Sequence, residues 1–162
     1  MHRRENWGAP LEGIAQAFLQ ILEKFGDTAL LLPLHRNPIV REPLQKVLGE
    51  HPRVFLTDPL DYGELVGAIQ RSHLLLTDSG GLQEEAPSLG KPVLVLRKTT
   101  ERPEAVAAGT AKLIGTQTEE IVMAAAELLS NPTAYEKMAT AINPFGDGHA
   151  AERILQIVTS YI

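Results

Sequence analysis

The sequence predicts an α/β fold, a Rossmann-like three-layer domain whose sheet is mostly parallel. Its 162 residues are 44% hydrophobic and 22% charged, which suits one globular domain with a sizeable core. Short apolar segments alternate with longer segments of helical periodicity, and glycine or proline lies between most of them. This alternation is typical of strands that pair in parallel, because each crossover between parallel strands usually contains a helix.

The first part of the chain is expected to hold helices and strands in turn. Residues 11–25 carry apolar side chains at helical spacing, and residues 28–33 (TALLLP) form a short apolar strand covered on both faces. Residues 38–48 form a helix that begins with proline, and Pro43 lies near its first turn. The elements that follow are a strand at 54–56, an amphipathic helix at 61–72 and a buried strand at 73–77.

The same alternation continues to the end of the chain. A helix at residues 81–89 ends with Gly90 as its C-terminal cap and leads to a strand at 92–96. Thr118 is expected to cap a helix at 118–129. The other expected elements are a helix at 103–108, a strand at 111–114 and helices at 132–142 and 150–161.

The front of the chain departs from the usual pattern. A parallel α/β domain usually begins with a strand, whereas HRREN at residues 2–6 leads almost directly into a helix. In the Rossmann strand order the first strand is central, between the strands at 28–33 and 73–77. We therefore expect the sheet to lack its first strand and the chain to be part of a longer protein. Because an open slot leaves backbone groups unpaired, we also expect self-association, as a homodimer.

Composition excludes several classes of function. The net charge of -5 lacks the broad basic field of sequence-independent nucleic-acid binding, so no nucleic-acid partner is expected. No apolar run approaches the roughly 20 residues of a membrane-spanning helix, so no membrane association is expected. Cysteine is absent, which removes thiolate metal sites and fits a cytoplasmic protein. No metal-binding motif is present, so the sequence predicts no metal site.

Polar and basic segments gather at the edge where open α/β sheets bind ligands, outside the carboxyl ends of the strands. These segments are HRREN (2–6), LHRNP (34–38), TDSGG (77–81) and LRKTTERPE (96–104). Although the whole chain is acidic, they contain the basic residues His2, Arg3, Arg4, His35, Arg36, Arg97, Lys98 and Arg102. This asymmetry favours a small anionic ligand.

The Ser79-Gly80-Gly81 turn between a strand and a helix is the first candidate for such a ligand. Backbone N–H groups at the helix start, together with the Ser79 hydroxyl, would hold a diphosphate. The alternative interpretation is a plain strand-to-helix turn. Glu84 and Glu85 are favourable charges near a helix start, but one of them could instead accept hydrogen bonds from a ribose diol. A phosphate and a ribose bound together would make a nucleotide site.

Four segments together resemble one protein family. They are HRREN (2–6), TDSGGLQEEAPSLGKPVLVLR (77–97), TTERPEAVAAGTAKLIG (99–115) and NPFGDGHAAERI (143–154). The chain is similar to the C-terminal, UDP-binding domain of bacterial, non-hydrolysing UDP-N-acetylglucosamine 2-epimerases, which is one half of a GT-B fold. The resemblance covers the whole chain, residues 1–162, and the second and third segments are specific to the family.

The resemblance implies an isomerase with two Rossmann-like domains and its active site in the cleft between them. Such enzymes interconvert UDP-GlcNAc and UDP-ManNAc without a cofactor, by elimination of UDP to give a 2-acetamidoglucal and re-addition. At matching positions, the diphosphate would lie at Ser79, Gly80 and Gly81, and the ribose hydroxyls at Glu85. The backbone of Leu65 would meet the uracil edge, where the family usually has an aromatic residue.

Three further positions match functional residues of the family. His2 would be catalytic, stabilising the leaving group beside the anomeric oxygen and the diphosphate. Arg3 and His35 match residues that hold a second, activating UDP-GlcNAc in some bacterial members.

One departure limits what the chain can do alone. The family's carboxylates that move the C2 proton belong to the N-terminal domain, which this chain lacks. We therefore expect a weak UDP site without epimerase activity. The alternatives are the UDP-binding half of a GT-B glycosyltransferase or of a hydrolysing epimerase, and a stand-alone nucleotide-binding or regulatory module.

Overall fold

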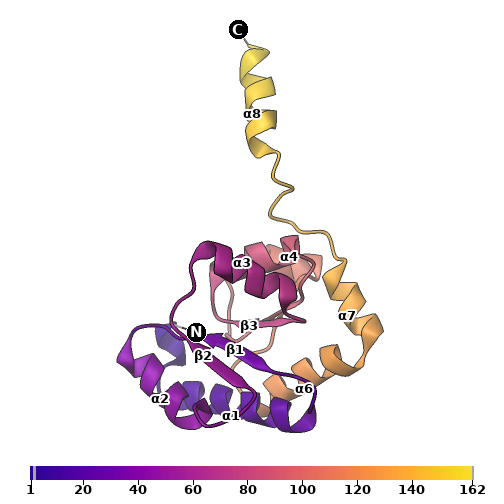
Figure 1. Ribbon diagram of the computed structural model, residues 1–162. Coiled ribbons are helices and arrows are strands. Elements are labelled where there is room, and N and C mark those ends of the chain that lie inside the picture. Colours follow the sequence, from indigo (N-terminus) through magenta and orange to yellow (C-terminus); the bar gives the residue numbers. More distant parts are fainter. Residues whose placement is uncertain (2, 162) are drawn as a thin grey trace.

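The computed structural model describes residues 1 and 3–161, so the predicted catalytic residue His2 lies outside the described residues. The described chain folds into helices and strands that alternate along most of the sequence (Figure 1). In order, they are η1 (Arg4–Asn6), α1 (Ala9–Lys24), β1 (Leu30–Pro33), α2 (Pro38–Leu48), β2 (Val54–Thr57), α3 (Tyr62–Arg71), β3 (Leu75–Thr77), α4 (Gly80–Ser88), β4 (Val93–Val95), α5 (Pro103–Ala108), β5 (Ala111–Leu113), α6 (Thr118–Ser130), α7 (Pro132–Ala139) and α8 (Ala150–Thr159).

All strand pairs of the described chain are parallel, which confirms the predicted α/β class. β1 pairs with β2 in one sheet, and β3, β4 and β5 follow one another in a second sheet. No hydrogen-bonded ladder joins the two sheets within the described residues. The break separates the strands of the first part of the chain from those of the second, as expected for a Rossmann-like sheet without its central strand.

Helices cover both faces of the strands, so the domain has three layers. Along β4, Val93 and Val95 contact an apolar cluster shared with α3, α4 and α5. Leu94 and the following Leu96 contact the larger cluster, shared with α1, α2 and α6. Figure 1 shows the same division, with α3 and α4 on one side of the strands and α1 and α6 on the other. The alternation explains why β4 is apolar at every position, since both of its faces are buried.

Two predictions about helix ends had different outcomes. Gly90 follows the end of α4 with a positive φ of 66°, which confirms its expected role as a cap. Thr118, in contrast, is the first residue of α6, and Gln117 is the N-cap. The Thr118 hydroxyl instead donates to the backbone oxygen of Gly13 in α1, at 3.0 Å. The predicted cap is therefore wrong, because this side chain fixes α6 to α1 rather than closing the helix.

The last helix stands away from the body of the protein. Figure 1 shows α8 joined to α7 by an extended segment and separated from the three layers. α8 has no buried residue, and its apolar side chains are exposed to solvent. They are Ile154, Leu155, Ile157 and Val158. None of the described helices combines the length and the apolar character needed to cross a membrane.

Candidate functional site

The turn that leads from β3 into α4 leaves its polar groups available to a ligand. Ser79 is the N-cap of α4, but its side chain makes no capping hydrogen bond. Its backbone N–H donates to the hydroxyl of Thr77, at 3.0 Å, which holds the turn in place. The first N–H groups of a helix have no partner within the helix, and they carry a partial positive charge. This turn therefore presents the Ser79 hydroxyl and several N–H groups to an anion.

Two guanidinium groups lie beside Gly80. A Cβ atom placed on Gly80 would be 3.6 Å from Nη2 of Arg3 and 4.0 Å from Nη2 of Arg102. Arg3 comes from the segment before η1 and Arg102 from the loop after β4, so two distant parts of the sequence meet at this glycine. Because Gly80 has no side chain, room for at least a methyl group remains between the two guanidinium groups and the helix start.

Glu84 and Glu85 have different surroundings, although they are adjacent in sequence. Glu84 forms an ion pair with Nε of Arg102. Oε1 of Glu85 lies 3.5 Å from the position of a Cβ on Gly81, and its buried Oε2 has no hydrogen-bond partner within the described chain. A buried carboxylate oxygen without a donor is costly, so Oε2 is the atom that a ligand hydroxyl would satisfy. Of the two carboxylates, Glu85 is thus the one that fits the predicted ribose contact.

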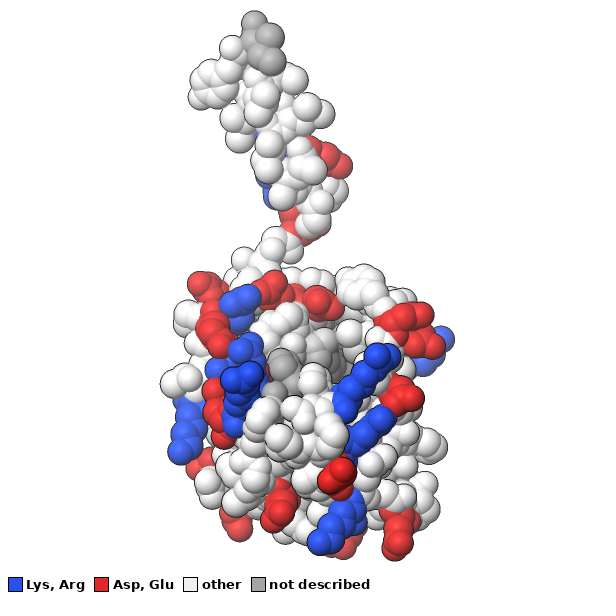
Figure 2. Space-filling model, turned by 90° about the vertical axis from the view of Figure 1, so that its left-hand side faces the viewer, with Lys and Arg blue, Asp and Glu red and all other residues white. Residues whose placement is uncertain are grey.

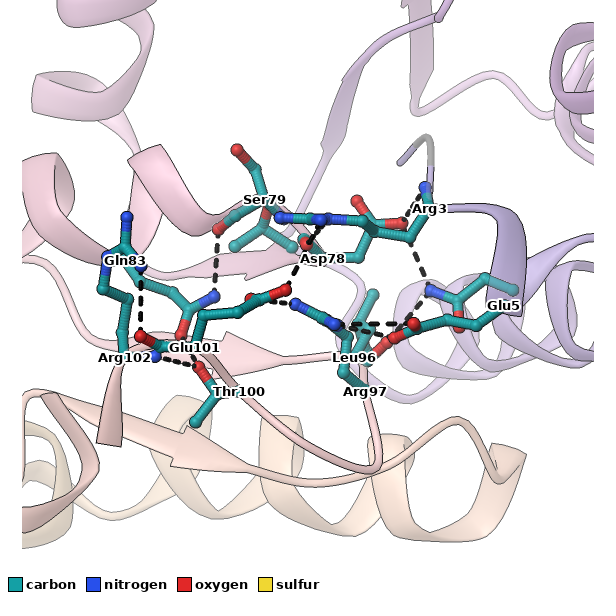
Figure 3. A network of polar contacts seen from close by, with 12 residues as sticks. Arg3, Glu5, Asp78, Ser79, Gln83, Leu96, Arg97, Thr100, Glu101 and Arg102 are labelled. Carbon is teal, nitrogen blue, oxygen red and sulfur yellow. Dashed lines mark hydrogen bonds and ion pairs between the residues drawn. The ribbon is translucent and has the colours of Figure 1, made fainter. Parts of the chain in front are cut away.

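Asp78 ties the start of the chain to this turn. Its fully buried side chain accepts hydrogen bonds through Oδ2 from the Arg3 backbone N–H, at 3.0 Å, and from Nδ2 of Asn6, at 3.2 Å. Nε of Arg3 also donates to the backbone oxygen of Asp78, at 3.3 Å. Figure 3 shows the Arg3 side chain extended along Asp78 toward Ser79. The sequence alone did not predict a role for Asp78, although Asp78 directly precedes Ser79 in the TDSGG segment (77–81).

Arg97, which the sequence groups with the basic residues of the site, is buried and paired with two carboxylates. Only 5% of its side chain is exposed. Nε lies 2.6 Å from Oε1 of Glu5, and Nη1 forms an ion pair with Glu101 (Figure 3). These hydrogen bonds raise the pKa of Arg97, and the one from Arg97 lowers the pKa of Glu101 to about 2. Arg97 therefore joins the η1 segment to the loop after β4.

The remaining predicted residues lie on neighbouring elements. Leu65 is in α3, where its backbone N–H donates to Asp61 at 2.9 Å, and its side chain shares an apolar cluster with Leu82 of α4. His35 is exposed at the carboxyl end of β1, and its Nδ1 accepts a hydrogen bond from the Asn37 N–H at 3.1 Å. Leu65 is thus placed beside the helix that carries Glu85, whereas its N–H already has a partner.

The charge around this turn is mixed rather than uniformly positive. Beside it, Arg3 pairs with Glu101 and Arg102 with Glu84, and on the face that Figure 2 shows, Lys and Arg side chains likewise lie in groups with Asp and Glu near them. Within the part of the chain that the structure describes, no group of three or more His, Asp and Glu side chains is arranged to hold a metal ion. The turn thus combines helix N–H groups with two neighbouring arginines, the donor types that an anion requires.

A separate hollow of about 510 Å³ lies on the other side of the loop after β4, against β5 and α6. Its charged lining residues include Lys112 and Glu127, which pair with each other at 3.1 Å. The hollow lies apart from the turn between β3 and α4, and none of the polar segments predicted to meet a ligand lines it except the Arg97–Lys98 end of the loop.

The chain is similar to known proteins over nearly its whole length. Residues 1–159 match the family described as UDP-N-acetylglucosamine 2-epimerase. The Bacillus subtilis protein of that description is 52% identical over 155 residues, which are 96% of this chain and 41% of the relative. The chain therefore spans less than half the length of the curated relatives that it matches.

Solved structures give the same result. The structure of Neisseria meningitidis UDP-GlcNAc 2-epimerase bound to UDP-GlcNAc has a TM-score of 0.92 and 48% identity, over 98% of this chain and 43% of that chain. The S. aureus MnaA–UDP co-structure has a TM-score of 0.93 and 50% identity, over 99% of this chain and 44% of that one. At 48% and 50% identity, the similarity to these structures extends to the sequence as well as to the fold.

Proposed function

The chain belongs to the UDP-N-acetylglucosamine 2-epimerase family, and we propose that it is the UDP-binding part of such an epimerase. The observation that carries this proposal is the start of α4, where two guanidinium groups flank Gly80 and the unpartnered oxygen of Glu85 lies one turn further on. Relatives solved with UDP-GlcNAc and with UDP support it. The family match also favours an epimerase over the glycosyltransferase alternative.

In the proposed complex the UDP lies along the first turn of α4. The diphosphate accepts hydrogen bonds from the N–H groups of Gly80 and Gly81 and from the Ser79 hydroxyl. The ribose hydroxyls donate to Glu85, whose Oε2 has no other partner in the described chain. The uracil lies toward Leu65 in α3, the helix that packs beside α4.

The proposed chemistry is elimination of UDP followed by re-addition. When the bond between the sugar and the diphosphate breaks, negative charge develops on the departing phosphate oxygen. Fixed N–H groups and guanidinium groups aimed at that oxygen stabilise the transition state more than the ground state. Arg3, whose Nη2 lies 3.6 Å from the Cβ position of Gly80, would supply such a contact. His2 would add a further donor, and the activator site at Arg3 and His35 stays a prediction.

We propose that the chain alone does not catalyse epimerisation. The carboxylates that would move the C2 proton are expected in the part of the full-length relatives that this chain does not match. A homodimer and a cytoplasmic setting likewise stay predictions. The exposed apolar side chains of α8 support self-association, and a monomer in light scattering at micromolar concentration would contradict it.

Calorimetric titration with UDP tests the proposed site, with UMP as the control for the second phosphate. We expect saturable binding of UDP, weaker binding of UMP, and loss of UDP binding in Glu85→Ala. Glu23→Ala is the matched control, because Glu23 is an exposed helical carboxylate in α1, outside the candidate site. The proposal would be contradicted if the folded wild-type chain did not bind UDP, or if the Glu85→Ala variant kept the wild-type affinity for UDP.

Activity is measured separately, by conversion of UDP-GlcNAc to UDP-ManNAc. We expect no turnover by the purified chain. Robust turnover would show that the proton-transfer groups lie within this sequence.

A further inference from the structure

The side chain of Gln83 joins the start of α4 to the loop after β4. Gln83 is completely buried. Its Nε2 donates to the backbone oxygen of Ser79 at 3.1 Å, and its Oε1 accepts a hydrogen bond from the Thr100 hydroxyl at 2.6 Å (Figure 3). A buried amide gains little net stability over an apolar side chain of the same shape, even when both of its groups are paired. The presence of a buried glutamine here is therefore better explained by the geometry that its two hydrogen bonds impose on Ser79 and Thr100 than by a gain in stability.

The same chain of hydrogen bonds continues to Arg102. The Thr100 hydroxyl accepts a hydrogen bond from the Arg102 backbone N–H at 3.0 Å, so this hydroxyl is both donor and acceptor. The guanidinium of Arg102 is held by Glu84 through Nε and by the backbone oxygen of Glu101 through Nη1, at 3.0 Å. Among the hydrogen bonds of the described residues, none uses its Nη2. The group is therefore fixed, with one donor nitrogen left beside Gly80.

The order of groups along the turn indicates what Arg102 would meet. The carboxylate of Glu85 lies against Gly81, and the two guanidinium groups lie against Gly80. If the ribose is at Glu85, the first phosphate follows it and the second phosphate is farther from the ribose. Groups beside Gly80 would then contact the second phosphate, which UDP has and UMP lacks.

We propose that Gln83 and Thr100 are positioning residues, which hold Arg102 beside Gly80 so that it binds the second phosphate of the nucleotide. This inference rests on the proposed UDP site. It assigns the preference for a diphosphate over a monophosphate to the loop after β4. An arginine suits the task, because its planar group is pre-oriented and presents paired N–H donors to phosphate oxygens.

Substitution of Thr100 tests the proposal, because Thr100→Val keeps the shape of the side chain and removes the hydroxyl. Affinities for UDP and for UMP are measured by calorimetry, and folding by thermal unfolding. We expect Thr100→Val to weaken UDP about tenfold, the effect of one displaced hydrogen bond to a charged group. UMP affinity should stay within about twofold, since its single phosphate is held by α4.

Two variants are controls for the hydroxyl. Thr100→Ser restores it and should restore the wild-type ratio of UDP to UMP affinity. Thr99→Val removes the neighbouring, exposed hydroxyl, which forms none of the hydrogen bonds of the described residues, and should leave both affinities unchanged.

Arg102→Lys keeps the charge without the planar group and leaves the buried pair intact, so it tests the proposal even if Thr100→Val fails to fold. It should show the same selective loss of UDP affinity. An unchanged ratio in folded Thr100→Val or Arg102→Lys would overturn the inference. An equal loss of UDP and UMP would also overturn it, because the loop would then act only through stability. Absence of UDP binding by the folded wild type would overturn the proposed function itself.

Discussion

Substitution of Gly80 by alanine separates the folding of the turn from its use as an anion site. In the structure, a methyl group on Gly80 meets its nearest neighbours, Nη2 of Arg3 and Nη2 of Arg102, at 3.6 and 4.0 Å. Both distances are ordinary van der Waals contacts, and the φ of Gly80 is not positive. The fold therefore accommodates the methyl group, which occupies the space that a phosphate would need.

The expected effects on stability and on binding have opposite signs. Alanine is favoured over glycine inside a helix by up to about 1 kcal/mol, and we expect about half of that at the first helical position. For a protein of this size, about 0.5 kcal/mol raises the melting temperature by roughly 1 to 2 °C. A phosphate displaced from the helix start loses at least one hydrogen bond to a charged group, about 1.5 to 3 kcal/mol, which weakens UDP between roughly 10-fold and 150-fold.

Thermal unfolding and UDP calorimetry on the same samples measure both effects. Gly26→Ala is the matched control, because a methyl group on Gly26 has no neighbour within 4 Å and Gly26 lies after α1, outside the site. A Gly80→Ala variant that melts at or above the wild-type temperature and keeps the wild-type UDP affinity would refute the placement of the phosphate against Gly80. A large loss of stability would refute the reasoning about space at this position.

Two further predictions concern stability. Leu94→Ala, at a fully buried position of β4, should reduce the free energy of unfolding by about 2 to 5 kcal/mol in urea titration. Ile142→Ala, at a position 86% exposed, is the control and should change it by less than about 0.5 kcal/mol. Similar values for the two variants would contradict the assigned core. The pKa of Glu101 is lowered from 4.5 to about 2 by the hydrogen bond from Arg97, so this carboxylate contributes stability that is complete above about pH 4.5 and is lost as the pH falls toward 2. Glu101→Gln should therefore be less stable than the wild type at pH 7, and the difference should shrink below pH 4.5; a difference independent of pH would contradict the ion pair.

The local parts of the site could be predicted from the sequence because they are contiguous. Residues 75–77 form an apolar strand, and the helix that follows begins at once, so Ser79, Gly80 and Gly81 must form the turn between them. The strand alternation also predicted the parallel pairing, since each strand is followed by a helix long enough to cross over. In such segments the covalent order already determines which groups become neighbours.

Contacts between distant segments could not be predicted in this way. Arg97 was grouped with the ligand-facing residues, but its partner Glu5 lies 92 residues away and neutralises it inside the protein. The difference between Glu84 and Glu85 arises from Arg102, which is 18 residues beyond Glu84 and forms an ion pair with it. Neither sequence periodicity nor a motif predicts such ion pairs, because they depend on which loops meet at the edge of the sheet.

The balance of charge at the site explains why a weak UDP affinity is expected. Three arginines in this network lie among four acidic side chains, of which three pair with guanidinium groups and the fourth accepts a hydrogen bond from the backbone N–H of an arginine. They are Arg3, Arg97 and Arg102, with Glu5, Asp78, Glu84 and Glu101. A diphosphate thus approaches a region without excess positive charge, and long-range attraction contributes little.

Attraction must come instead from short-range donors, namely the N–H groups of α4, the Ser79 hydroxyl and the two Nη2 atoms beside Gly80. Such donors act only when the phosphate oxygens fit their directions. A site of this kind would select its ligand by geometry more than by charge.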